Sequence, residues 1–180
     1  MLPTRRLGSK FLLRRALSTT VDQAAVLQSV QTPGGATKLY DDWAETYDET
    51  LTKWDYQAPA EVAALATTLM ADRASILDCG CGTGLAGEAL QREGFTEVSG
   101  VDISTASLEV SRSKGVYNSV QHGSLEEPLP FAADTFAGVV CVGVLSYITD
   151  RRALQSEWLR VTKPGGYIIF THRQDLWDDD

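Results

Sequence analysis

The sequence predicts an α/β protein built on a parallel β-sheet. From residue 75 onward, short apolar segments alternate with helical segments, which is the pattern of repeated β-α-β units. The first of these strands runs into a glycine-rich turn and then into a helix. The chain has 180 residues, of which 43% are hydrophobic and 22% charged, as is ordinary for a globular protein with one core. We therefore expect a doubly wound sheet with helices on both faces.

Two helices are expected before the first strand. Apolar residues recur at four-residue spacing from Leu39 to Leu51, which predicts a helix over 38–51. Pro59 suits a first helical turn, and the alanine-rich sequence after it predicts a helix over 60–72. The other expected elements are strands at 75–78, 97–101, 116–121, 136–142 and 167–171, and helices at 85–93, 105–113 and 151–162.

Residues that begin or end helices support these bounds. Ser104 is a preferred N-cap residue, and Gly94 and Gly115 suit the left-handed conformation that ends many helices. The sequence Pro164-Gly165-Gly166 is expected to end the last helix, because proline cannot continue it.

The net charge of −8 is unevenly distributed. Residues 1–20 hold five basic residues and no acid, which leaves 11 basic against 24 acidic residues in 21–180. The basic segment has the composition of a mitochondrial transit peptide, with a disordered basic tail as the equal alternative, so the expected location is mitochondrial or cytoplasmic. A linker with a short helix follows over 21–37, and the folded domain is expected over 38–180. This acidic domain repels phosphate backbones, so nucleic acid is not an expected partner.

The cysteine, histidine and hydropathy patterns argue against disulfide-rich, metal-binding and membrane-spanning classes of protein. Three cysteines are too few for a disulfide framework, and the two histidines form no cluster with zinc-ligand spacing, so no metal is expected. The longest apolar stretch, 137–148, has 12 residues, whereas a membrane-spanning helix needs about 20. We therefore expect no membrane segment.

A glycine-rich turn carries the main functional signal. The segment 78–84, with the sequence DCGCGTG, has three alternate glycines that permit a sharp turn and a close approach of a ligand to the main chain. Gly82 also begins a G-x-G-x-x-G sequence, which is typical of dinucleotide-binding turns. However, the Asp78 carboxylate would repel a pyrophosphate at this position. It favours a ligand with positive charge, such as the ammonium and sulfonium groups of S-adenosylmethionine.

A second acid ends the next strand. Asp102 follows Asp78 by 24 residues, close to the spacing at which an acid reaches a ribose diol. A carboxylate can accept hydrogen bonds from both hydroxyls of the diol. The alternative is an acid placed there because the dipole of the following helix favours it.

The sequence resembles class I S-adenosylmethionine-dependent methyltransferases. Four stretches match in order, namely ILDCGCGTG, VSGVDIS, the run from Asp134 to Tyr147, and LRVTKPGG. The opening sequence YDDWAETYDETLTKWDYQAP further resembles the methyltransferase-like family associated with the Williams–Beuren chromosomal region. The resemblance covers about 38–172 and implies a Rossmann-like fold, S-adenosylmethionine as cofactor and methyl transfer as activity.

The resemblance also implies roles for individual positions. Asp78 would lie near the ammonium group and Asp102 would hold the ribose. Tyr40 and Tyr47 would cover the cofactor from the first helix, with core packing as the equal alternative. The other expected cofactor contacts are the turn residues Gly80, Cys81, Gly82 and Gly84, the adenine-side residues Ile103, Ser124 and Leu125, and Val142 and Gly143 near the methyl group.

Two features depart from the family pattern. Ser124 stands where an aspartate often meets the adenine amine, and a hydroxyl is a weaker acceptor than a carboxylate. The sequence reaches only to Asp180, so we expect the sheet to lack the family's sixth and seventh strands. These departures keep a second hypothesis open, an inactive cofactor-binding or interaction module on a methyltransferase core. An NAD-binding oxidoreductase is the third hypothesis, and it predicts nicotinamide binding without affinity for S-adenosylhomocysteine.

The sequence assigns no catalytic residue. Methyl transfer depends mainly on orientation, and a general base is needed only where the acceptor loses a proton. His172, at the carboxyl end of the last expected strand, and Tyr147 are candidates for such a base. Aromatic residues are expected to form an apolar pocket for a small-molecule methyl acceptor, namely Trp43, Trp54, Tyr56, Tyr147 and Trp177.

Overall fold

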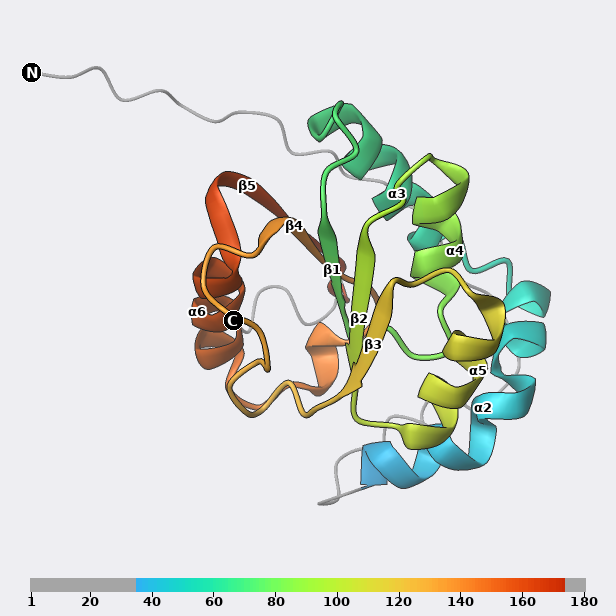
Figure 1. The fold of residues 1–180 in the computed structure, drawn as a ribbon. Coiled ribbons are helices and arrows are strands. Elements are labelled where there is room, and N and C mark those ends of the chain that lie inside the picture. Colours follow the sequence, from blue (N-terminus) through green and yellow to red (C-terminus); the bar gives the residue numbers. More distant parts are fainter. Residues whose placement is uncertain (1–34, 174–180) are drawn as a thin grey trace, which may run out of the picture.

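The computed structural model of the chain describes residues 35–173 (Figure 1). Five strands form one parallel sheet in the order β3-β2-β1-β4-β5. This arrangement confirms the predicted α/β fold with a Rossmann-like, doubly wound parallel sheet. The strands are β1 (Ile76–Cys79), β2 (Val98–Asp102), β3 (Ser119–His122), β4 (Phe136–Cys141) and β5 (Thr162–Phe170).

Helices cover both faces of the sheet, as Figure 1 shows. Helices α3, α4 and α5 lie on one face, α2 packs outside them against α5, and α6 lies on the other face. Because the chain returns after β3 to place β4 beside β1, the crossover helices of the two halves lie on opposite faces. The helices are α2 (Gly35–Lys53), α3 (Ala58–Leu69), α4 (Leu85–Arg92), α5 (Thr105–Lys114), the 3₁₀ turn η1 (Leu145–Tyr147) and α6 (Arg151–Val161).

Alternation along β1 separates two hydrophobic cores. Ile76 packs in the cluster that includes residues of α3 and α4, whereas Leu77 and Cys79 belong to the cluster that contains Trp158 of α6. Because successive side chains of a strand point to opposite faces, Asp78 shares the face of Ile76. Its carboxylate is therefore directed toward the side of the sheet that α4 covers.

Helix termini follow the expected capping chemistry. Ser104 precedes α5, and its Oγ accepts a hydrogen bond from Ser107 N at 3.1 Å. Gly115 ends that helix in the left-handed conformation, with φ of 64°. Asp150 caps α6 in the same way as Ser104 caps α5, accepting from Ala153 N at 2.9 Å.

Strand β5 begins earlier than predicted. It starts at Thr162, directly after α6. Thr162 already pairs with Phe136 of β4, and pairing resumes at Tyr167 after the proline and glycines. Gly165 has φ of 82°, and the pairing register shifts between Phe136 and Gly138. The proline and glycines therefore form an irregular stretch within the strand, rather than a loop before it.

Strand β3 begins later than predicted, at Ser119 rather than at 116. The Tyr117 side chain instead packs against the cluster beneath α3 and α4. Asn118 makes two hydrogen bonds to the first residue of β2: its backbone N–H donates to Val98 O, and its side-chain Oδ1 accepts from Val98 N, each at 2.8 Å.

Several predicted features lie outside the described residues. These are the basic segment 1–20, most of the linker 21–37 and Trp177, so the division into domains stays a prediction. None of the described helices is long and apolar enough to cross a membrane. Within residues 35–173, no strand pairs with the outer edge of β5.

Candidate functional site

The glycine-rich turn lies at the carboxyl ends of β1 and β2, beside the point where the strand order reverses toward β4. Open α/β sheets bind ligands at such a point. Gly80, Gly82 and Gly84 have φ of 76°, 50° and 100°, a backbone region that favours glycine. A Cβ added at Gly82 would meet nothing within 4 Å. The main chain at Gly82 therefore faces open space, which fits a closely approaching ligand.

Asp102 joins the end of β2 to this turn. Its Oδ2 accepts from Gly82 N and its Oδ1 accepts from Ser104 N, each at 2.8 Å. Burial raises the pKa of Asp102, while the backbone hydrogen bonds oppose that shift. Each carboxylate oxygen retains capacity for a further hydrogen bond, so the arrangement fits the expected contact with a ribose diol.

Asp78 is fully buried at the end of β1. Its Oδ2 accepts a hydrogen bond from Tyr117 Oη at 2.7 Å, and its Oδ1 has no partner among the described residues. Burial raises the pKa of Asp78 to about 7, with a contribution from the nearby Asp102 charge, and the Tyr117 hydrogen bond opposes the shift. A buried acceptor without a partner is costly, so Oδ1 fits a cationic donor supplied by a ligand.

Tyr117 is a site residue that the sequence did not indicate. Its Oη also accepts from Gly87 N, at 3.2 Å, in the first turns of α4. A Cβ on Gly87 would come within 2.4 Å of the Tyr117 ring. Gly87 is the third glycine of the G-x-G-x-x-G sequence, so that glycine makes room for an aromatic ring in this protein. A glycine inside a helix was the one signal that could have indicated a bulky neighbour.

The remaining residues that were predicted to contact the cofactor differ in exposure and in position along the edge of the sheet. Ile103 is an exposed apolar side chain directly after Asp102, as expected for a surface that packs on an adenine. Cys81 is buried with its Sγ toward Gly100, so it offers a ligand its main chain. Ser124 and Leu125 lie after β3: the Ser124 hydroxyl accepts from Glu126 N, and Leu125 is buried in the core. Val142 and Gly143 directly follow β4, at the same edge of the sheet.

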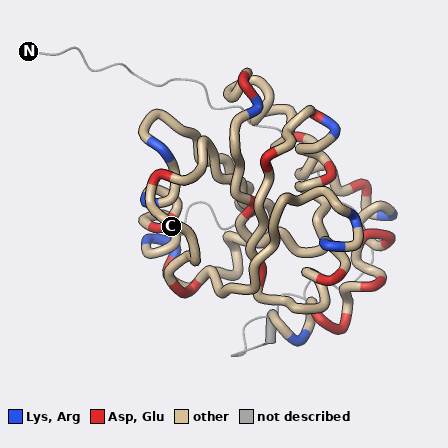
Figure 2. The backbone as a smooth tube through the Cα atoms, in the orientation of Figure 1, with Lys and Arg blue, Asp and Glu red and all other residues tan. Residues whose placement is uncertain are grey.

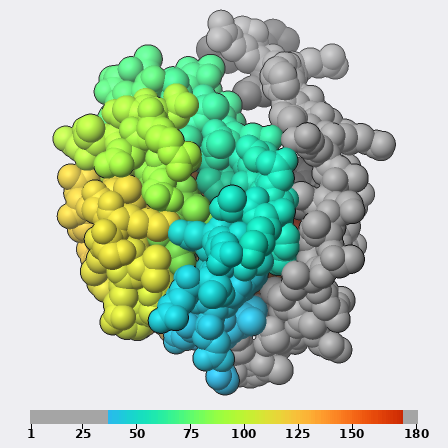
Figure 3. Space-filling model, turned by 90° about the vertical axis from the view of Figure 1, so that its right-hand side faces the viewer, coloured from blue at the N-terminus to red at the C-terminus, as the bar shows by residue number. Residues whose placement is uncertain are grey.

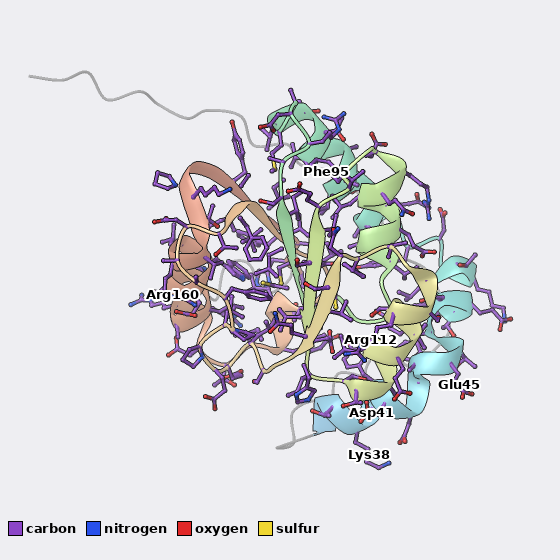
Figure 4. The ribbon with its side chains drawn as sticks, in the orientation of Figure 1. Lys38, Asp41, Glu45, Phe95, Arg112 and Arg160 are labelled. Carbon is purple, nitrogen blue, oxygen red and sulfur yellow. The ribbon has the colours of Figure 1, made fainter. Side chains whose placement is uncertain are left out.

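Helix α2 is attached to the site through two of its acids (Figures 3 and 4). Figure 3 shows α2, in blue to cyan, lying directly against the α5 region, and Figure 4 shows Asp41 on the side toward α5. Asp41 Oδ1 accepts from Ser104 Oγ at 2.6 Å. Asp48 Oδ1 accepts from the hydroxyl of Thr83 in the glycine-rich turn at 2.5 Å, and Asp48 also pairs with Lys114 of α5.

The same helix carries an aromatic cluster that reaches the end of β4. Tyr40 contacts the Tyr47 ring at 6.0 Å between centroids and the Tyr147 ring at 6.2 Å. Trp43 packs against Trp54 at 5.8 Å. Tyr56 approaches the segment after β4, since a Cβ on Gly143 would lie 2.8 Å from its Oη. The structure thus brings together Trp43, Trp54, Tyr56 and Tyr147 and adds Tyr40 and Tyr47 to them, while Trp177 lies outside the described residues.

Three tyrosines of this cluster, Tyr40, Tyr47 and Tyr56, remain neutral at ordinary pH. Burial raises the pKa of Tyr56 to about 12, and burial raises the pKa of Tyr40 and Tyr47 further. These phenols therefore donate hydrogen bonds rather than accept protons. The base candidate Tyr147 contacts Tyr40, and His172 lies half-buried just beyond β5. Among residues 35–173, no group of three His, Cys, Asp or Glu side chains could hold a metal ion.

The strand order, the glycine-rich turn and the acid at the end of β2 define a class I S-adenosylmethionine-dependent methyltransferase fold. A family model described as "Methyltransferase domain" matches residues 77–170. Since this match covers more than half of the sequence, the chain belongs to the methyltransferase domain family.

Curated relatives agree with this assignment. The chain is 38% identical to human Methyltransferase-like protein 27 over 147 residues, which cover 78% of this chain and 60% of that protein. This match is consistent with the resemblance of the opening helix to a methyltransferase-like family. The chain is also 35% identical to the Ubiquinone biosynthesis O-methyltransferase of Alkalilimnicola ehrlichii over 100 residues, 53% of this chain and 40% of the relative. It therefore spans between about two fifths and three fifths of these relatives' lengths.

Solved structures share the fold. A SAM-dependent methyltransferase from Thermotoga maritima, described as a possible histamine N-methyltransferase, aligns with a TM-score of 0.60 at 21% identity, over 74% of this chain and 60% of that one. An S-adenosylmethionine dependent methyltransferase from Mesorhizobium loti aligns with a TM-score of 0.50 at 26% identity, over 54% and 45% of the two chains.

Proposed function

We propose that the protein binds S-adenosylmethionine at the carboxyl edge of its sheet and transfers the methyl group to a small molecule. One observation carries this proposal: Asp102 is hydrogen-bonded to Gly82 N in the glycine-rich turn, next to the unpartnered Oδ1 of Asp78. This pair of acids offers acceptors for a ribose diol and for an ammonium group. A dinucleotide pyrophosphate would meet the Asp78 charge instead.

The contribution of the protein would be binding and orientation. When bound, S-adenosylmethionine supplies a methyl group on a positively charged sulfur that is already activated for displacement. Asp102 would hold the ribose and Asp78 the ammonium, which fixes the methionine end against the main chain near Gly82. The aromatic cluster of α2 would exclude water above the turn, since Tyr40 and Tyr47 are half-buried and their rings pack against each other.

The aromatic cluster also supports a small acceptor. Tyr40, Trp43, Tyr47 and Tyr147 pack against one another as a partly exposed aromatic surface, and Tyr147 lies in η1 shortly after β4. Such a surface suits an apolar or aromatic molecule. Helix α2 carries more acidic than basic residues (Figure 2), and the sequence has a net charge of −8, so a nucleic-acid acceptor is disfavoured. The match to Ubiquinone biosynthesis O-methyltransferases is compatible with this acceptor class.

Calorimetry with S-adenosylhomocysteine tests the cofactor assignment. The Asp102→Ala variant is expected to bind about tenfold or more weakly, because hydrogen bonds to a charged group are lost. Asp42→Ala is the matched control, since Asp42 is an exposed acid of α2 that pairs only with Lys38 in the described structure. Unchanged affinity of Asp102→Ala would remove the ribose role, and a wild-type protein that binds no S-adenosylhomocysteine would refute the proposed function.

Product formation separates an enzyme from an inactive binder. The protein would be incubated with S-adenosylmethionine carrying a labelled methyl group and with panels of phenols, amines and carboxylates. Transfer of label to a small molecule is the expected result. Binding of the cofactor without transfer to any panel would favour the inactive binding module.

A further inference from the structure

We propose that Tyr117 is a positioning residue for the methionine end of the cofactor: its hydroxyl fixes the Asp78 carboxylate so that Oδ1 is left to accept the ligand's ammonium group. This inference rests on the proposed function and extends it to a residue outside the glycine-rich turn. Tyr117 lies between α5 and β3, 39 residues along the chain from the carboxylate it contacts.

A short hydrogen-bonded relay holds the carboxylate. Gly87 N donates to Tyr117 Oη at 3.2 Å, and Tyr117 Oη donates to Asp78 Oδ2 at 2.7 Å. The N–H belongs to the N-terminal part of α4, where the helix dipole is positive. Its hydrogen bond to the phenol oxygen strengthens the phenol as a donor, because successive hydrogen bonds polarise one another. The relay uses only Oδ2, and Oδ1 has no partner within the described residues.

Two glycines leave the space that the Tyr117 ring occupies. A Cβ at Gly84 would lie 3.3 Å from the Tyr117 ring, and a Cβ at Gly87 would lie 2.4 Å from it. The ring therefore fills space that ordinary residues of the turn and helix would occupy. Because the half-buried ring packs against both glycine positions and its hydroxyl bonds to Gly87 N and Asp78, the carboxylate is oriented before a ligand arrives.

The hydrogen bond from Tyr117 affects how much of Asp78 is ionised at neutral pH. Asp102 on β2 opposes ionisation of Asp78, and the neighbouring thiols of Cys79, Cys81 and Cys141 are neutral because burial raises their pKa values. Burial raises the pKa of Asp78 to about 7, and the Tyr117 hydrogen bond acts in the opposite direction. Without the hydroxyl, the pKa of Asp78 would rise further, and a smaller fraction would be ionised at neutral pH.

The test is the Tyr117→Phe variant, which keeps the ring and removes the hydroxyl. Calorimetry with S-adenosylhomocysteine between about pH 6 and pH 8.5 is expected to show about tenfold weaker binding at pH 7. The loss should shrink toward the upper end of this range, with the midpoint of the pH profile moved upward by about one unit. The same variant should bind 5′-methylthioadenosine as tightly as the wild type, because that ligand has no ammonium group.

The controls separate positioning from a structural role. Tyr167→Phe changes an exposed tyrosine of β5 and should leave both affinities and the pH profile unchanged. Equal losses of affinity for S-adenosylhomocysteine and 5′-methylthioadenosine, or an unmoved pH midpoint, would overturn the role of Tyr117. Failure of the proposed function gives a different result, since the wild-type protein itself would then bind neither ligand.

A second substitution keeps the test decisive if Tyr117→Phe fails to fold. Site-specific replacement of Tyr117 by 3,5-difluorotyrosine retains the ring and the hydroxyl but makes the phenol a stronger donor. The midpoint of the pH profile for S-adenosylhomocysteine should then move downward. A midpoint that stays in place would contradict the proposal.

Discussion

At the scale of single residues, the site depends on a carboxylate that is unfavourable in the free protein. Asp78 is fully buried, and only one of its oxygens has a partner in the described structure. Its pKa is raised from 3.8 to about 7, so the folded protein binds more protons than the unfolded chain between these pH values. Stability contributed by this group is therefore lost as pH rises from about 4 to 7, and the loss is constant above that range.

Asp78→Asn is accordingly expected to stabilise the protein while weakening the cofactor site. At pH 8 the free energy of unfolding should rise by about 2–4 kcal/mol, since each pKa unit corresponds to about 1.4 kcal/mol. The gain should become much smaller near pH 4. Urea unfolding at several pH values measures this difference, with Asp72→Asn in an exposed loop as control. A variant no more stable than the wild type at pH 8 would contradict the burial cost.

Gly87 gives a second prediction about a single residue. Replacing a helical glycine by alanine ordinarily stabilises a helix by about 1 kcal/mol. Here the added Cβ would lie 2.4 Å from the Tyr117 ring, so Gly87→Ala should instead destabilise the protein by about 1–3 kcal/mol. The effect should vanish or reverse in a Tyr117→Ala background. Equal effects in the two backgrounds, measured by thermal unfolding, would show that the ring is not the cause.

At the scale of elements, the link between α2 and the rest of the domain is polar as well as aromatic. Asp48 connects α2 both to Thr83 of the glycine-rich turn and to Lys114 of α5. Lys114 also pairs with Glu88 of α4 at 3.0 Å. Movement of α2 is therefore coupled to the turn that would hold the methionine end of the cofactor.

Asp48→Ala is expected to loosen this attachment without unfolding the domain. Amide hydrogens of α2 should exchange about three- to tenfold faster, which corresponds to the loss of about one net hydrogen bond. Glu49→Ala is the matched control, because Glu49 pairs with Lys53 on the exposed face of the same helix. Hydrogen exchange followed by mass spectrometry compares the variants. Equal exchange in both would show that Asp48 contributes nothing to docking.

Elements with strong local signals could be predicted from the sequence. The helix over 38–51 and the glycine-rich turn followed from residue spacing, because four-residue periodicity is specific to helices and alternate glycines are specific to tight turns. The predicted start of β5 was wrong, since Pro164 and the following glycines end a helix whether or not the chain then pairs with a neighbour. Whether these residues form a strand depends on hydrogen bonds to β4, and the local sequence does not specify that pairing.

Candidate site residues could be predicted only where a single segment of the sequence carries the signal. Asp78 and Asp102 could be predicted as site residues because each stands at the end of an apolar strand. Tyr117 was missed, since its partner lies 39 positions away and the contact exists only once β1 and α4 are packed. The docking of α2 through Asp41 and Asp48 was missed for the same reason.

At the scale of the whole molecule, the sheet is packed between two hydrophobic cores, one on each face. Trp158 is fully buried in the core beneath α6 and packs on Phe170 at 5.7 Å between ring centroids. Trp158→Ala should lower the free energy of unfolding by about 3–5 kcal/mol through loss of burial and formation of a cavity. Leu159→Ala, at a side chain that is 68% exposed, should change it by less than about 0.5 kcal/mol. Similar losses in the two variants, measured by urea unfolding, would refute this assignment of the core.

The candidate site is assembled from separate parts of the chain, and the proposed function gives these parts different roles. The acids expected to grip the cofactor stand at the ends of β1 and β2, whereas the aromatic cluster comes from α2 and the segment after β4. On the proposed function, substitutions of cluster residues after β4, such as Tyr147, are expected to change acceptor preference more than affinity for the methyl donor.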